Sequence, residues 1–356
     1  PYDKQSIIEN NIELCHRYGL DTTEGDKCLP VIYWMPKMHK NPTASRFIIA
    51  SSKCSTKPLA RVICSVFKLI FHQIQNFHSR STFYSQYKIF WVVQNSFPVI
   101  NKLEKINVKK NAKRISTFDF KTLYTKIEHG NLVEVLNSII EFVFKGGSHK
   151  AIAFNKYKAF WAQKYKKGYF SKEGLKAVVK HLIVECHFEL GNLLFTQVIG
   201  IPMGIDPAPF WANLYLYVYE CRYMTNLIKT DKQKAFRYHG SSRFIDDMCC
   251  INDSGEFQKS FKDIYPPSLE LKIEHQGEHA TFLDLEINII DKTFVYKLYD
   301  KRDDFPFDIV TMPNLHSDIP SYIFYSSILS EFLHIAHCTL HLSDLFPLAL
   351  VLYKIM

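Results

Sequence analysis

The sequence has no CxxC pair, no apolar run long enough to cross a membrane, and no internal repeat or low-complexity tract. Its nine cysteines are scattered and odd in number, which is typical of reduced thiols and not of a secreted disulfide framework. A membrane-spanning helix needs about 20 apolar residues, whereas the last apolar stretch, Leu345 to Met356, is short and interrupted by Pro347. Because no signal peptide precedes the first predicted helix, we expect an intracellular protein, nuclear or cytoplasmic, with no membrane partner.

What the sequence has in quantity is apolar and basic residues. Over 356 residues, a hydrophobic content of 47% is enough for a sizeable core and for two or three packed subdomains. Lysine and arginine number 44 against 35 aspartate and glutamate, a formal net charge of +9, and they are accompanied by 28 Phe and 20 Tyr. Basic side chains hold phosphates and aromatic rings stack on bases, so the composition suits a polyanionic partner. A solvated basic surface would have the same composition.

Two adjacent aspartates, Asp246 and Asp247, lie between apolar runs in the stretch from Ser241 to Cys250. The pattern predicts a strand, a tight turn at the aspartates and a return strand. Neighbouring carboxylates with apolar flanks have little to pair with except a cation or solvent, and a divalent metal is the natural partner. Because aspartate is also common in solvent-exposed turns, this stretch alone leaves both interpretations open.

A third aspartate lies far upstream, in the same kind of apolar frame. Ile115 to Tyr124 is predicted to place Asp119 at the end of a strand, with the aromatic ring of Tyr124 five residues further on. The 127 residues that separate Asp119 from Asp246 are no obstacle, because adjacent strands of one sheet can unite them. The third aspartate therefore favours a metal site.

The remaining patterns indicate an α+β fold. Helices are predicted near the N-terminus up to Gly19, from Pro58 to about Ile89, from Leu132 to Phe142, from about Phe210 to Leu227 and from Phe257 to Ile264. Strands are predicted for Val31 to Lys40, Ser45 to Ser52, a hairpin over Phe188 to Phe195, Leu269 to His275, Thr281 to Ile287 and Thr293 to Lys297. Residues 145 to 172 look like an insertion or mobile loop, and residues after about Asp300 look helical. This order predicts a sheet covered by helices on one face.

Two further segments carry residues suited to nucleotide binding. Lys37, Lys40 and Arg46 lie close to the loop of the first predicted hairpin, where they could close over a triphosphate. An ordinary solvated hairpin is the alternative. The loop from Gln197 to Pro209 is punctuated by glycine and proline, and glycines there would let a base pair or sugar approach the backbone closely.

In their order along the chain, these blocks resemble a reverse transcriptase over about residues 31 to 300. The four blocks that carry the resemblance are Phe118-Asp119-Phe120 with Tyr124 (the first palm motif), Gly200 to Asn213 (the template-positioning loop and helix), Phe244 to Asp247 (the catalytic hairpin) and Phe282-Leu283-Asp284 (the primer grip). Within that superfamily the sequence is most similar to Penelope-like retroelements, the branch related to telomerase. Four segments carry this closer match: Met35 to Lys40, Asp119 to Ile127, Ala212 to Leu214 and Phe282 to Leu285. The sequence departs from the family at Asp206, where a serine is usual, and no GIY-YIG endonuclease is visible.

The resemblance implies a right-hand polymerase fold, with an antiparallel palm sheet covered by helices, fingers and a helical thumb. It implies an N-terminal helix and fingers over residues 1–114, a palm over 115–290 with a fingers-like insertion at about 140–195, and a primer-grip end with part of a thumb over 291–356. The implied activity is that of the RNA-directed DNA polymerase of a retrotransposon, with an RNA template, a DNA primer and dNTPs as partners. A catalytically inactive, domesticated module that binds RNA or hybrid duplex and a telomerase-type reverse transcriptase are the alternatives.

The resemblance also implies roles for single residues. Asp119, Asp246 and Asp247 are implied to be catalytic, and Asp119, Phe120 and Asp246 to hold two Mg²⁺ ions, or Mn²⁺ in their place. Tyr124 is implied to be a steric gate against the ribose 2′-hydroxyl. The residues implied to contact the nucleotide are Arg46, Lys37, Lys40, Tyr124, Met203, Gly204 and Lys272, and those of the primer grip are Phe282, Leu283 and Asp284. Lys272 is a candidate proton donor to pyrophosphate, with an exposed strand lysine as the alternative.

One cluster in the C-terminal part stays outside this scheme. His334, His337, Cys338 and His341 lie at helical spacing, so a metal-ligand set on one helix face is geometrically possible. Nothing near them in the sequence completes such a set. A surface or packing face of the last lobe is therefore the interpretation that the sequence favours.

Overall fold

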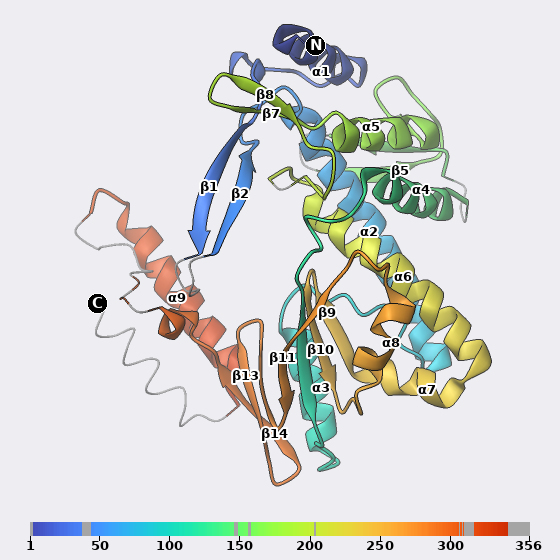
Figure 1. Cartoon of the computed structure of the whole chain (residues 1–356), viewed down its shortest axis with the longest axis vertical. Helices are drawn as coiled ribbons and strands as arrows, with labels where there is room; N and C mark the ends of the chain where they lie inside the picture. Colours follow the sequence, from blue (N-terminus) through green and yellow to red (C-terminus); the bar gives the residue numbers. More distant parts are fainter. Residues whose placement is uncertain are drawn as a thin grey trace.

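The structure, a computed structural model, describes residues 3–37, 44–145, 149–155, 158–202, 204–305, 307, 309 and 317–340. Within these residues the chain forms four small sheets and two groups of helices, arranged as an upper part and a lower part joined by the long helices α2 (Lys57–Ser85) and α6 (Ala208–Thr230) (Figure 1). The helix α9 (Ser321–Cys338) lies to one side. The predicted α+β class is confirmed.

The lower part is built on a four-stranded sheet in the order β11-β3-β10-β9. Its strands are β3 (Ile115–Phe120), β9 (Ser241–Phe244), β10 (Asp247–Ile251) and β11 (Leu271–Gly277), and all neighbours are antiparallel. Phe118 and Phe120 point to one face and pack on Phe257 and Phe261 of α8 (Glu256–Ile264), with ring centroids 5.2 and 5.5 Å apart. Because side chains alternate along a strand, Asp119 points to the opposite face.

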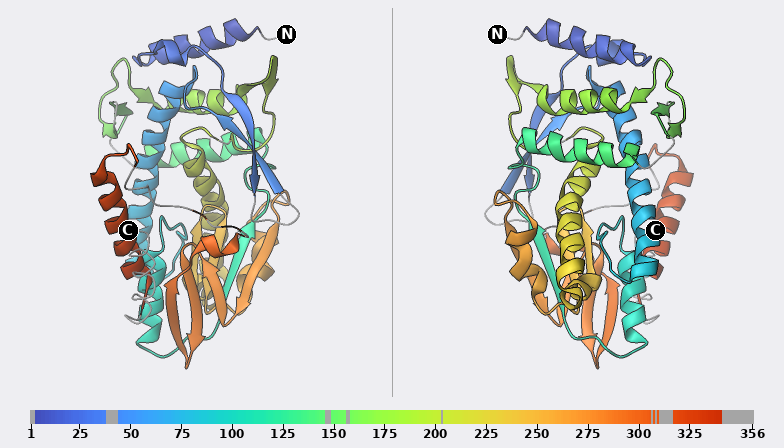
Figure 2. Two further views of the ribbon diagram at one scale, coloured as in Figure 1. Left: turned by 90° about the vertical axis from the view of Figure 1, so that its left-hand side faces the viewer. Right: turned by 90° about the vertical axis from the view of Figure 1, so that its right-hand side faces the viewer.

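The largest core runs through both parts, from α2 and α6 to the face of the lower sheet that carries Phe118 and Phe120. Helices α4 (His129–Lys145) and α5 (Lys172–Val184) pack on each other and lie across α2 and α6 (Figure 2). Trp211 of α6, which is fully buried, meets Phe67 of α2 edge-on at 6.0 Å. The apolar faces from which α2 and α6 were predicted are therefore the surfaces on which these two helices pack.

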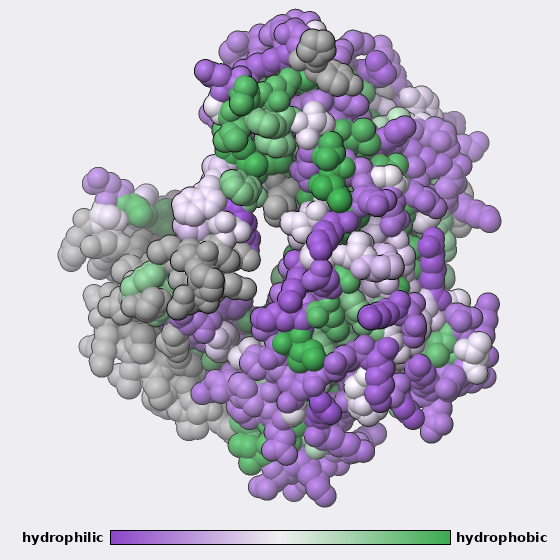
Figure 3. Space-filling model, viewed as in Figure 1, coloured by the Kyte–Doolittle hydropathy of each residue, from purple (hydrophilic) through white to green (hydrophobic). Residues whose placement is uncertain are grey.

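A second sheet, in the order β2-β1-β7-β8, extends from the upper part toward the lower one. Its strands are β1 (Val31–Lys37), β2 (Ala44–Ala50), β7 (His187–Leu190) and β8 (Leu193–Thr196), below α1 (Lys4–Arg17). Both predicted hairpins are confirmed, although residues 38–43 lie outside the described part. Figure 3 shows hydrophobic side chains gathered over these hairpins and a hollow between the upper and lower parts.

The segment from 145 to 172, which looked like a loop, contains a three-stranded sheet. Its strands are β4 (Ala151–Phe154), β5 (Ala159–Ala162) and β6 (Phe170–Ser171). Ala151, Ile152 and Phe170 are fully buried. Of the two interpretations, an insertion or a mobile loop, the mobile loop is wrong, because the strands are very short and the polar residues between them dominate the composition.

The C-terminal part adds a three-stranded sheet, β12-β13-β14, and α9. The strands are β12 (His279–Phe282), β13 (Leu285–Ile290) and β14 (Thr293–Leu298), and α3 (Phe97–Asn107) packs against β14. The single strand predicted from Thr281 to Ile287 is wrong, because the chain turns at Leu283, where φ is +56°. Among the helices that the structure describes, including α7 (Lys232–Arg237), none combines the length and apolar character needed to cross a bilayer.

Candidate active site

Strand pairing brings the three predicted aspartates together. Asp119 and Asp247 are direct partners in the antiparallel pairing of β3 with β10, so their side chains lie on the same face of the sheet. Asp246 occupies the turn between β9 and β10, and its carbonyl oxygen accepts a hydrogen bond of 3.0 Å from the backbone nitrogen of Phe120. All three carboxylates are half-buried. The structure therefore unites residues that are 127 positions apart in the sequence.

The turn that carries Asp246 has an unusual backbone. Phe244 pairs with Asp247, so Ile245 and Asp246 form a two-residue turn, and Ile245 has a φ of +52°. A β-branched residue rarely adopts this left-handed conformation. The sequence placed the turn at both aspartates, whereas Asp247 is already the first residue of β10.

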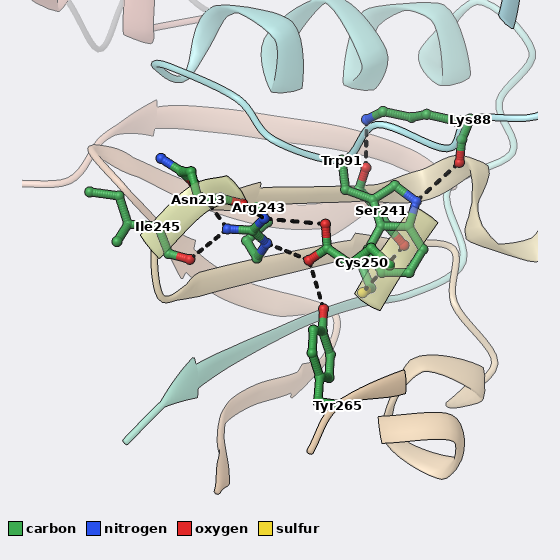
Figure 4. A network of polar contacts seen from close by, with 9 residues as sticks. Lys88, Trp91, Asn213, Ser241, Arg243, Ile245, Cys250 and Tyr265 are labelled. Atoms are coloured by element: carbon green, nitrogen blue, oxygen red, sulfur yellow. Dashed lines mark hydrogen bonds and ion pairs between the residues drawn. The ribbon is translucent and has the colours of Figure 1, made fainter. Parts of the chain in front are cut away.

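A buried arginine holds this turn in place. The guanidinium of Arg243, which is fully buried, donates to the carbonyl oxygen of Ile245 at 2.8 Å and to Glu220 Oε1 at 2.5 Å (Figure 4). It also donates to the side-chain and backbone oxygens of Asn213, both at 3.0 Å, while Tyr265 donates to Glu220 Oε1 at 2.8 Å. This network ties the β9–β10 hairpin to the middle of α6.

The sequence did not predict that Arg243 and Glu220 hold this turn. Arg243 stood inside the predicted strand and Glu220 inside the predicted helix, and a charged residue in either element is ordinarily solvent-exposed. The signal in the sequence was that Glu220 lies in a predicted helix with many apolar residues, among them Leu216 and Val218. The start of β9 is held separately, because Lys88 Nζ donates to the carbonyl oxygen of Ser241 at 2.6 Å (Figure 4).

The position of Asp247 raises the proton affinity of its carboxylate. Burial, followed by the negative charges of Asp246 and Asp119, raises the pKa of Asp247 to about 7. Three acidic side chains in one place are unfavourable without a cation. Hard carboxylate oxygens are the ligands that Mg²⁺ prefers, so the donor set fits such an ion. The ring of Phe120 is 2% exposed and packs on the helix side, so only its backbone could contribute a ligand.

Tyr124 lies close to this cluster. Its side chain is half-buried, and burial together with the charge of Asp246 raises the pKa of its hydroxyl. Its carbonyl oxygen accepts a hydrogen bond of 3.1 Å from the nitrogen of Ile201, and a Cβ on Gly200 would lie 2.4 Å from that oxygen. The glycine-containing loop is therefore packed directly against the segment that follows β3.

The second glycine of this loop touches the first hairpin. Gly204 has a φ of +108°, and a Cβ there would lie 1.9 Å from the carbonyl oxygen of Ile49 in β2. The hydroxyl of Ser51 donates to the carbonyl oxygen of Gly204. The backbone that approaches Gly200 and Gly204 in this structure is thus the protein's own, which is a sufficient physical reason for both glycines.

Asp206, the residue that departs from the family pattern, has a partner. Its carboxylate accepts two hydrogen bonds from Lys57 Nζ, at 2.8 and 2.9 Å, and the two side chains are 26% and 12% exposed. Lys57 is the first residue of α2. The substitution is therefore accommodated by an ion pair that fastens the loop to that helix.

The residues predicted to contact the triphosphate are only partly described. Arg46 is exposed on β2, three residues before the Ile49 carbonyl that meets Gly204. The side chain of Lys37 and the whole of Lys40 and Met203 lie outside the described part. The described part therefore places Arg46 on the strand that meets the glycine loop.

Lys272 is the register partner of Asp119 on β11, and the two residues share a face of the sheet. Its ammonium group lies 2.5 Å from Glu274 Oε1, with the side chains 44% and 36% exposed. An ion pair this exposed contributes little to stability, about 0–1 kcal/mol. This placement agrees with a proton donor, because Lys272 lies beside the aspartates and could leave Glu274 for another partner. It agrees equally with an exposed strand lysine.

The predicted primer-grip residues form the turn between β12 and β13. Phe282 is 3% exposed, Leu283 is half-buried, and Asp284 is paired with His334 of α9. A cavity of about 290 Å³ lies between this turn and the face of the sheet that carries Asp247. Its lining includes Asp247, Thr117, Glu274, Phe282, Leu283 and Lys301. The hairpin therefore borders the space next to Asp247.

Comparison with solved structures shows the same architecture in telomerase. The telomerase of Candida tropicalis in complex with a TWJ fragment of telomeric RNA matches with a TM-score of 0.55 and 15% identity, over 98% of this chain and 56% of that chain. The Candida albicans enzyme with the same type of fragment gives 0.54 and 13%, over 85% of this chain and 52% of that chain. The apo Candida tropicalis enzyme gives 0.50 and 14%, over 92% and 56%.

This chain therefore spans about half the length of the telomerase chains that it matches. At these identities the likeness shows the fold alone, and the fold is that of a right-hand polymerase, as the sequence predicted. No protein-family model matches the sequence, and no match is found among the curated proteins.

Proposed function

We propose that this chain is an RNA-directed DNA polymerase that extends the 3′-hydroxyl of a DNA primer on an RNA template. The observation that carries the proposal is the direct pairing of Asp119 with Asp247 across two strands, with Asp246 in the adjoining turn. This arrangement stands in a chain whose fold matches telomerase polymerases over most of its length. Carboxylate oxygens gathered in this way are the ligands that a divalent ion such as Mg²⁺ prefers.

The proposed chemistry needs little covalent help from the protein. Asp119 and Asp246, with the backbone of Phe120, would hold two Mg²⁺ ions, or Mn²⁺ ions, and Asp247 would supply the neighbouring carboxylate. When bound, such ions activate the primer hydroxyl and stabilise the charge that develops on the phosphates. The protein's own contribution is rigidity, since the Arg243 network fixes the turn that presents Asp246.

The remaining roles are proposals on the same basis. Tyr124 would exclude a ribose 2′-hydroxyl, which its position beside Asp246 supports. Lys272 would donate a proton to the leaving pyrophosphate, and its place next to Asp119 supports this. Contacts to the triphosphate and template are assigned to Arg46, Lys37, Lys40, Met203 and Gly204, and primer contacts to Phe282, Leu283 and Asp284.

The source of such a polymerase is a finer proposal. We assign it to a Penelope-like retrotransposon, on the sequence resemblance of Met35 to Lys40 and Asp119 to Ile127, and we place its activity in the nucleus or cytoplasm. A telomerase-type enzyme is the second candidate, favoured by the structural likeness to telomerase. A module that binds RNA or hybrid duplex without catalysis is the third.

Primer extension on poly(rA)/oligo(dT) tests the proposal. The purified chain should incorporate dTTP in the presence of Mg²⁺, and Asp246→Asn should reduce incorporation by at least about 100-fold while hybrid binding stays nearly unchanged. Asp263→Asn, at an exposed position of α8, is the matched control and should retain activity. Extension by Asp246→Asn would refute the assigned site. Hybrid binding without extension by the wild type, with Mg²⁺ or Mn²⁺, would establish the non-catalytic module.

A further inference from the structure

The turn between β12 and β13 meets α9 through three side chains of different chemistry. Asp284 Oδ2 lies 2.5 Å from His334 Nε2 and 4.0 Å from Cys338 Sγ. One ligand-type atom from each of the three residues lies within 4.8 Å of the other two. The sequence offered only the histidine and the cysteine, because the carboxylate comes from 50 residues upstream of His334.

We propose that Asp284, His334 and Cys338 bind a Zn²⁺ ion that fastens α9 to the β12–β13 hairpin. Thiolate, imidazole and carboxylate are all zinc ligands, and the soft thiolate disfavours Mg²⁺ and Ca²⁺. With the thiol deprotonated, the two negative charges of Asp284 and Cys338 neutralise the ion. This site is separate from the aspartates of the sheet and does not depend on polymerase activity.

The two helical ligands are already positioned for such an ion. His334 and Cys338 are four residues apart on α9 and therefore lie on one face. The end of the helix is held by a hydrogen bond of 3.0 Å from the nitrogen of Leu340 to the carbonyl oxygen of Tyr296 in β14. The neighbouring His337 is turned away, since its ring packs edge-on against Phe97 at 5.2 Å.

Small adjustments would complete the coordination. Tetrahedral zinc with bonds of about 2.0–2.3 Å holds its ligand atoms roughly 3.3–3.7 Å apart. The Asp284–His334 contact would therefore lengthen by slightly under about 1 Å, and the Asp284–Cys338 separation would shorten by a few tenths of an ångström. The side chains of Asp284 and His334 are 35% and 38% exposed, so water can reach the fourth position, while Cys338 is fully buried.

Helix α9 has reason to need an additional anchor. Of its 18 residues, the buried ones are Phe324, Ile335 and Cys338. A helix usually gains its stability from a packed apolar face, and here that face is narrow. An ion at Asp284 would hold the helix to the hairpin whose Phe282 and Leu283 line the cavity beside Asp247. The position of that hairpin would then depend on zinc.

Metal titration of the purified 356-residue chain, after treatment with a chelator, tests the proposal. Co²⁺ is the probe, because a cobalt–thiolate bond gives a charge-transfer absorption, and Zn²⁺ should displace it at one equivalent. Cys338→Ser should abolish the absorption, and His334→Ala should weaken binding by at least about tenfold. His337→Ala and Cys221→Ser are the matched controls and should bind as the wild type does. Asp246→Asn should also bind normally, which separates this site from the carboxylates of the sheet.

Hydrogen exchange provides a readout that does not depend on the spectrum. Zinc should slow exchange in residues 321–338 of the wild type and leave it unchanged in Cys338→Ser. The proposal is overturned if the wild type binds no stoichiometric Co²⁺ or Zn²⁺, or if the absorption survives Cys338→Ser. In either case the Asp284–His334 contact is a hydrogen bond without a metal.

Discussion

Arg243 and Glu220 form an ion pair in which neither side chain has any solvent exposure, with Nε 2.5 Å from Oε1. The pair is satisfied on both sides, because Asn213 and Ile245 accept the other guanidinium protons and Tyr265 donates to the carboxylate. Buried charges are retained only when such partners offset the loss of hydration. The buried pair also positions the turn, because the same guanidinium holds the carbonyl of Ile245 next to Asp246.

Arg243→Ala should lower the free energy of unfolding by about 3–5 kcal/mol, because it leaves Glu220 buried without its partner. Tyr265→Phe removes one hydrogen bond to the same carboxylate and should cost about 1–3 kcal/mol. The measurement is urea unfolding followed by far-UV circular dichroism. Arg237→Ala is the control, since its pair with Glu256 leaves the arginine side chain 48% exposed and should contribute less than about 1 kcal/mol. Equal losses in Arg237→Ala and Arg243→Ala would contradict this account.

Gly204→Ala should be far more damaging than Gly191→Ala. Both glycines have positive φ, +108° and +60°, but only Gly204 faces a backbone carbonyl, that of Ile49, at 1.9 Å from an added Cβ. No atom lies within 4 Å of an added Cβ at Gly191. Gly191→Ala should therefore cost about 1–2 kcal/mol of conformational strain. Gly204→Ala should cost more and separate β2 from the loop.

Thermal unfolding of the two glycine variants distinguishes these costs. If the loop and β2 act as one unit, Gly204→Ala should also raise the KM for dNTP, because Arg46 lies on the same strand. Similar melting temperatures for the two variants would show that the loop relaxes away from β2 freely.

The three aspartates could be predicted from the sequence because their signals are local. Apolar runs around the aspartates predicted the strand that carries Asp119 and the hairpin that carries Asp246 and Asp247, and the pairing of those strands fixes the rest. The four motifs in order then indicated the polymerase fold, which the likeness to telomerase confirms. The motifs could not predict the buried contacts that hold the β9–β10 hairpin in place. Arg243 and Glu220 are 23 residues apart and meet only after α6 packs on the sheet.

Other features were missed because they depend on backbone conformations or contacts that composition does not reveal. The turn at Leu283 requires a positive φ from a leucine, whereas the alternating apolar pattern around it indicates a continuous strand. The sheet at Ala151 to Ser171 was hidden by the polar residues between its short strands. The partner that completes the His334–Cys338 pair lies on another element, so helical spacing alone favoured a packing face.

His78 should contribute a loss of stability as the pH decreases from about 7 to about 5. This residue is 4% exposed, its Nε2 lies 2.6 Å from the hydroxyl of Tyr217, and burial lowers the pKa of its imidazole from 6.5 to about 4. The unfolded chain therefore binds a proton in this range that the folded chain does not, so its stabilising contribution is present above about pH 6.5 and is lost as the pH falls toward 4.

Comparison of wild type with His78→Phe isolates this contribution. Between pH 7 and pH 5, the wild type should lose about 2 kcal/mol more of unfolding free energy than the variant does. Urea titrations at both pH values provide the measurement. A phenylalanine can keep the packing on Phe90, whose ring stacks on the imidazole at 6.1 Å. If both proteins lose the same amount, His78 is not the titrating group.

Tyr124 is the residue whose proposed role is most open to direct refutation. If its ring occupies the space of a ribose 2′-hydroxyl, Tyr124→Ala should increase incorporation of rNTP relative to dNTP by at least about tenfold, because a steric clash is removed and no contact to dNTP is lost. Tyr124→Phe keeps the ring and removes only the hydroxyl, so it should discriminate as the wild type does. Single-nucleotide incorporation with dTTP and UTP on the same primer gives both values of kcat/KM. Because Tyr124 also packs on the core, the melting temperature of each variant is needed. A folded Tyr124→Ala with unchanged discrimination would leave the ring with a packing role alone.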